Sequence, residues 1–94
     1  MYNRRMQGLP GAELIDKGLA DLLRNEETIE SLLVSIGSPR LRALGVRLGP
    51  VLDNPEHRLY ALLDHTHGDN AHGQYNALIR RLVSYERALA CARP

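Results

Sequence analysis

The chain has 94 residues, of which 44% are hydrophobic and 24% charged, and its net charge is +1. This length leaves room for one domain, and the composition is that of a folded chain rather than a disordered one. Dinucleotide-binding sheets and (β/α) barrels need more residues, and so small a net charge favours neither nucleic acid nor membrane as a partner.

Leucine dominates the apolar residues, with seventeen Leu against four Ile and four Val. Leucine keeps its side-chain freedom on a helix, whereas β-branched residues lose it. No strand-like alternation of apolar and polar residues occurs in the sequence. We therefore expect an all-α fold.

Residues 1–9 show no apolar periodicity and are predicted to form a flexible N-terminal arm before a single helical domain, 10–94. The arm lacks the apolar segment of a signal peptide, and no apolar run approaches the ~20 residues that cross a bilayer. Cys91 is the only cysteine, which excludes an internal disulfide and suits a reducing compartment. We expect a cytoplasmic protein without a membrane segment.

The first long apolar stripe runs from Ala12 to Ile36 in steps of three and four residues, with Glu26 in the position between Leu22 and Ile29. Leu23 and Leu32 widen it. Because the stripe keeps its phase throughout, one helix over about 11–36 is predicted. The alternative is a helical hairpin whose second helix is capped by Asn25.

Three turn-forming residues follow this stripe. Gly37 is predicted to close the helix in the left-handed conformation, and Ser38 to cap a short helix over about 39–44 that begins at Pro39. Gly45 then stops that helix, and a loop follows over 45–54. The loop residues expected to plug the core are Val46, Leu48, Val51 and Leu52.

Asn54 and Pro55 predict the start of a second short helix, which runs to about residue 65. Its expected buried residues are Leu59, Tyr60, Leu62 and Leu63. A loop over 66–70 leads to a second long helix over about 71–92. The predicted fold is a small bundle of two long antiparallel helices, 11–36 and 71–92, joined by the short helices 39–44 and 55–65.

The last helix carries a heptad seam, which is typical of helix–helix interfaces. We expect this seam to join two copies of the chain as a homodimer, and the alternative is the core face of one copy. The seam consists of Tyr75, Leu78, Leu82, Tyr85 and Leu89.

Three histidines, His65, His67 and His72, fall within eight residues of one another. Imidazoles are ligands of zinc and other transition metals. The spacing matches no standard zinc site, and a polar loop between helices explains the cluster equally well. No cofactor is expected, and metal binding at these histidines is an alternative hypothesis.

Arginine side chains offer a second alternative, contact with an anion or a nucleic acid. A turn at Gly37 and Ser38 that opens onto a helix would present backbone N–H groups and a positive helix end, which suits phosphate. A helix-turn-helix is disfavoured, because the short helix 39–44 is too small to be a recognition helix. The candidate contacts are Arg40, Arg42, Arg47, Arg80, Arg81 and Arg87.

No nucleophile, base and orienting acid fall into a catalytic arrangement in this sequence. We therefore expect a small non-catalytic helical interaction module that binds a second copy of itself, or another protein. A nucleic-acid-binding regulator that uses the arginines is the first alternative, and a metal-dependent protein that uses the histidines is the second. Nucleic acid and membrane are not the expected partners.

Overall fold

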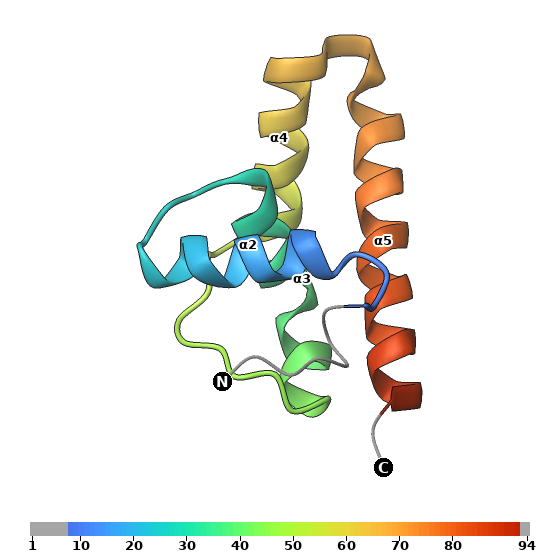
Figure 1. Ribbon diagram of the computed structural model, residues 1–94. Coiled ribbons are helices and arrows are strands. Elements are labelled where there is room, and N and C mark those ends of the chain that lie inside the picture. Colours follow the sequence, from blue (N-terminus) through green and yellow to red (C-terminus); the bar gives the residue numbers. More distant parts are fainter. Residues whose placement is uncertain (1–7, 93–94) are drawn as a thin grey trace.

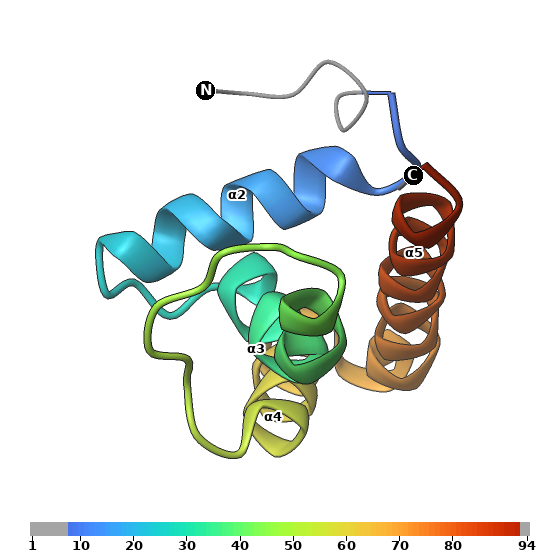
Figure 2. The same ribbon diagram turned by 90° about the horizontal axis from the view of Figure 1, so that it is seen from below.

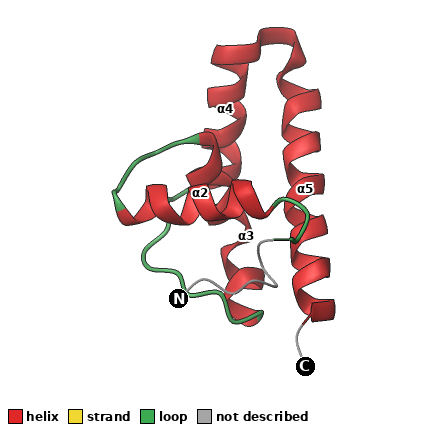
Figure 3. Cartoon of the chain, in the orientation of Figure 1, coloured by secondary structure: helices red, strands yellow, loops and turns green. Residues whose placement is uncertain are grey.

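The computed structural model describes residues 8–92, and helices make up 76% of this part of the chain, with no strand (Figures 1 and 3). The elements are α2 (Ala12–Leu23), α3 (Ile29–Ala43), α4 (Pro55–His67), a 3-10 turn (Gly68–Asn70) and α5 (Ala71–Ala92). The prediction of a small all-α bundle is confirmed. The predicted arm falls largely on residues 1–7, outside the described residues, and Leu9 at its end packs against the core.

Three helices run roughly along one direction, and α2 lies across them (Figures 1 and 2). The first half of α5 lies beside α4 and its second half beside α3, so α5 spans the whole height of the bundle. The prediction that a helix over 11–36 is the antiparallel partner of the last helix is therefore wrong. The antiparallel neighbour of α5 along the hairpin at 68–70 is α4.

The prediction of one helix over 11–36 is wrong, and the hairpin alternative is correct. Residues 24–28 leave the helix at Asn25, whose φ of 57° is left-handed. The cap of α3 is Thr28 rather than Asn25: its Oγ1 accepts the N–H of Ser31 at 3.0 Å, and Ser31 Oγ accepts the N–H of Thr28 at 2.7 Å. This reciprocal capping box satisfies two backbone donors that a helix start leaves free.

The predicted break at Gly37 is also wrong, because α3 continues to Ala43 and contains residues 39–43 as its last turn. Gly37 and Ser38 are buried, and a Cβ on Gly37 would lie 2.8 Å from Leu82 Cδ1 on α5. Packing against α5 thus holds these residues helical. Pro39 removes one backbone donor, and the helix ends one turn later, before Gly45 with its φ of 93°.

In the second half of the chain, the structure agrees more closely with the helices predicted from the sequence. Helix α4 starts at Pro55 as predicted but runs to His67, so the predicted loop over 66–70 shrinks to one 3-10 turn. The prediction that Tyr60 is buried is wrong, because it is 39% exposed and contacts Tyr75 with the ring planes tilted by 52° and the ring centroids 5.7 Å apart. The other predicted core residues of α4 and of the loop are buried or half-buried: Leu59, Leu62, Leu63, Val46, Leu48, Val51 and Leu52.

Helices α2 and α3 cross closely at Gly18. This residue is buried in the middle of α2, and a Cβ there would overlap the backbone carbonyl oxygen of Glu30 and the Cγ2 atom of Val34. A backbone carbonyl cannot move aside as a side-chain end can. The absence of a side chain at Gly18 therefore sets the distance between the two helices.

Two glycines inside helices give a matched test of this crossing. Gly18→Ala should lower the free energy of unfolding by about 3 kcal/mol or more, because α2 must separate from α3 to admit the methyl group. Gly37→Ala should cost less than about 1 kcal/mol, since it meets only the flexible ends of Leu82 and Glu86 and gains helix propensity. Urea denaturation followed by circular dichroism measures both. Equal losses in the two variants would contradict the account.

Candidate interaction surface beside Leu23

The predicted dimer seam on α5 lies in the core of the single chain. Leu82, Tyr85 and Leu89 are buried, and Tyr75 and Leu78 are half-buried against the same core. The seam is therefore the core face of α5, which is the alternative that the sequence left open. A surface for a second copy has to be sought elsewhere on the chain.

The histidines do not form a metal site in the part of the chain that the structure describes. His65 and His67 lie at the end of α4, whereas His72 lies on α5, where its Nε2 is 3.2 Å from Asn76 Nδ2. Within residues 8–92, no three His, Cys, Asp or Glu side chains come together in a group that could hold a metal ion. The geometry therefore gives the metal hypothesis no support.

Several of the six candidate arginines have partners within the chain. Arg42 donates to the carbonyl oxygen of Gly49 at 2.9 Å, and Arg81 pairs with Glu13. Arg40 lies near Glu86, whose pKa is raised by burial and partly lowered again by this guanidinium. Because α3 is continuous through residues 37–39, neither the phosphate-binding corner nor a helix-turn-helix exists here.

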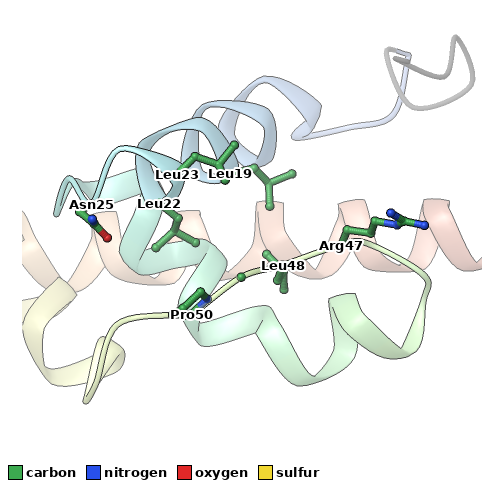
Figure 4. A pocket seen from close by; sticks show the side chains of 8 residues that line it. Leu19, Leu22, Leu23, Asn25, Arg47, Leu48 and Pro50 are labelled. Carbon is green, nitrogen blue, oxygen red and sulfur yellow. The ribbon is translucent and has the colours of Figure 1, made fainter.

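An open apolar groove lies between the end of α2 and the loop that follows α3 (Figure 4). Its volume is about 210 Å³. The α2 side consists of leucines, and the loop side of a short extended segment. The lining residues are Leu19, Leu22, Leu23, Asn25, Arg47, Leu48, Gly49 and Pro50.

Leu23 stands out at the rim of this groove. Its side chain is 84% exposed, the largest exposed fraction of any large apolar residue that the structure describes. Sequence reasoning placed Leu23 on the apolar stripe of one long helix and so missed it. The signal that could have found it is its position directly before five polar residues, 24–28, where α2 ends.

The two ends of the groove differ in charge. Arg47 stands at one end, exposed and without a hydrogen bond or ion pair to the described residues. Asn25 lies at the other end, and Glu26 follows it in the chain with a side chain that is 55% exposed. Glu26 pairs with Arg24 at 2.9 Å. The groove therefore has a free guanidinium at one end, and near the other end a Glu26 carboxylate that lies outside the lining residues and is paired with Arg24.

A buried carboxylate holds the turn that carries this acidic end. Asp21 is 1% exposed and accepts from Lys17 Nζ at 2.7 Å, from Thr28 Oγ1 at 2.7 Å and from Arg24 Nη2 at 2.6 Å. Its backbone carbonyl also accepts the N–H of Glu26 at 2.9 Å. The hydrogen bonds from Lys17 and Thr28, helped by the charges of Lys17 and Arg24, hold the pKa of Asp21 below its usual range.

The contacts of Asp21 fix the end of α2 relative to the start of α3. Leu23 lies between Asp21 and Asn25 in the chain and is therefore carried on a turn locked from both sides. Because the backbone at Leu23 is already fixed, little backbone freedom is lost when a partner covers its side chain. The backbone of this apolar surface is therefore already ordered in the single chain.

Comparison of the chain with family models, with curated proteins and with solved structures found no match. The chemistry of the surface has to be read from its own residues. The groove is lined by apolar groups, one amide and one guanidinium, with no carboxylate, imidazole or thiol among its lining residues. Such a surface can recognise an apolar side chain but has no group for acid–base or nucleophilic catalysis. None of the described helices has the length and apolarity to cross a bilayer.

The lowered pKa of Asp21 predicts a pH-dependent contribution to stability. The carboxylate is stabilised in the folded chain, so its contribution is complete above the unfolded pKa of about 3.9 and is lost as the pH falls through the lower folded pKa. Asp21→Asn should therefore lower the melting temperature strongly near pH 7, and this deficit should shrink toward about pH 2. Asp53→Asn, at an exposed position, is the matched control and should melt like the native chain. A deficit for Asp21→Asn that stays constant with pH would refute the assignment.

Proposed function

We propose that this chain is a small non-catalytic helical interaction module that associates with a second copy of itself through the surface around Leu23. The observation that carries the proposal is the exposure of Leu23, 84%, beside an apolar groove of about 210 Å³. Burying one leucine side chain contributes about 1.5–3 kcal/mol. Two copies that cover each other's Leu23 gain this contribution twice.

The size of the chain supports association. A domain of this length buries only about 60–65% of the surface that its unfolded chain exposes, so its own core is modest. The α5 seam is already used within that core, and among residues 8–92 the most exposed large apolar side chain is Leu23 at the end of α2. A second copy would extend the hydrophobic core at the end of α2, where Leu23 lies at the surface.

The arginines support a nucleic-acid partner less well than the groove supports a protein partner. A phosphate-binding face needs arginine or lysine side chains that are not already bound to acceptors of the same chain. Arg42 and Arg81 are already engaged with Gly49 and Glu13. The net charge of +1 also supplies little attraction for a polyanion.

Light scattering on the purified chain tests the proposal. At about 100 μM, a concentration at which a dimer with micromolar Kd is nearly fully formed, the native chain should show twice its monomer mass of 10.5 kDa. Leu23→Asp should reduce the mass to that of a monomer because the charge would be buried without a partner. Its melting temperature at high dilution should be unchanged, since the side chain is exposed in the single chain.

Ala61→Asp provides the control, because this residue is exposed on α4 and outside the groove. It should keep the mass of the native chain. A native chain that remains a monomer at this concentration would contradict self-association. Loss of the dimer in Ala61→Asp as well as in Leu23→Asp would contradict an interface confined to the groove.

A further inference from the structure

We infer that the groove of each copy receives Leu23 of the other copy about a two-fold axis, with Arg47 of one copy beside Glu26 of its partner. This inference rests on the proposed self-association and adds the pairing geometry. It assigns the occupant of the groove, the symmetry of the pair and the charged contact that sets the orientation.

A projecting leucine and an apolar groove share one surface of the chain. Leu23 lines the groove at its rim and is also the most exposed large apolar side chain described. In a two-fold interface the same patch occurs on both copies, so each projection has to meet the other copy's hollow. Because Leu23 stands at the rim of the groove, each copy offers both the projecting side chain and the groove that can receive it.

Charged side chains give the groove a direction. Arg47 and Asn25 lie at opposite ends in Figure 4, and Glu26 directly follows Asn25. A two-fold axis perpendicular to the groove reverses its direction in the second copy. The arginine end of one copy then faces the Glu26 end of the other, whereas a parallel arrangement would place like charges together.

Arg47 and Glu26 both have hydrogen-bonding capacity left for this contact. Arg47 has five N–H donors and no acceptor among the described residues. The Glu26 carboxylate receives one hydrogen bond, from Arg24 Nε, and a carboxylate accepts about four. The two contacts per dimer, one at each end, would add orientation to the apolar contact of the leucines.

The area of the chain is sufficient for such a pair. A stable interface takes about 800 Å² from each partner, less than a seventh of the 5989 Å² that the chain exposes. The groove is too small to supply this alone. The exposed side of the α2 end and of the loop over 46–50 must therefore complete the contact.

Charge reversal tests the pairing by sedimentation equilibrium. Arg47→Glu and Glu26→Arg, each alone, should raise the dimer Kd about tenfold or more, because each places two like-charge contacts in the dimer. The double variant Arg47→Glu with Glu26→Arg should return to within about threefold of the native Kd, since both contacts are restored in reverse. Arg87→Glu, on the exposed side of α5, is the control and should leave the Kd unchanged.

Cysteine pairing gives a second measurement that does not depend on charge. Both variants are made in a Cys91→Ala chain, so each copy carries one thiol. Chains with Leu23→Cys mixed with chains with Pro50→Cys should form an intermolecular disulfide in a glutathione buffer, because Pro50 lines the groove that receives the partner's residue 23. Leu23→Cys mixed with Arg87→Cys should not.

The outcomes separate this inference from the proposed function. A native dimer that Leu23→Asp dissociates, but whose double charge reversal is no better than the two single ones, overturns the pairing and leaves the proposed surface standing. A native monomer overturns both. Recovery in the double variant, together with the disulfide at Pro50, supports the pairing. A disulfide that forms equally well with Arg87→Cys contradicts it.

Discussion

The close crossing of α2 and α3 at Gly18 is the constraint on which the arrangement of the chain depends. Because no side chain stands at Gly18, α2 lies directly on the backbone of Glu30. One turn later, Asp21 binds Thr28 at the start of α3 and so fixes the reversal between the two helices. Leu23 is held away from the core by these two neighbouring contacts, which is why an apolar side chain projects at the surface.

Local signals predict the second half of the chain well. Pro55 sets the start of α4, and the three-four spacing from Tyr75 to Leu89 predicts α5 over its whole length. The first half departs from its local signals for physical reasons. Apolar residues stay in phase across residues 24–28 because α2 and α3 face one core, so the stripe hides the turn. At Gly37, burial beneath α5 outweighs the helix-ending tendency of the sequence.

The candidate surface could not be predicted from the sequence, because its two sides come from segments far apart in the chain. Leu23 belongs to α2, while Arg47 and Pro50 follow α3. The hairpin at Asp21 and the hydrogen bonds that hold the later loop against α3 together bring them to one place. The seam on α5 was visible in the sequence, but periodicity alone does not distinguish a core face from an interface. The fold answers that question by burying Tyr85 completely within one chain.

The central claim is that the groove beside Leu23 is where two copies meet, and amide hydrogen exchange tests it most directly. The same chain is compared at a low concentration, where it is monomeric, and at a high one. We expect slower exchange at high concentration for residues 22–25 and 46–49, with no change along α5. Slower exchange confined to α5, or no difference at a concentration where the chain is a dimer, would contradict it.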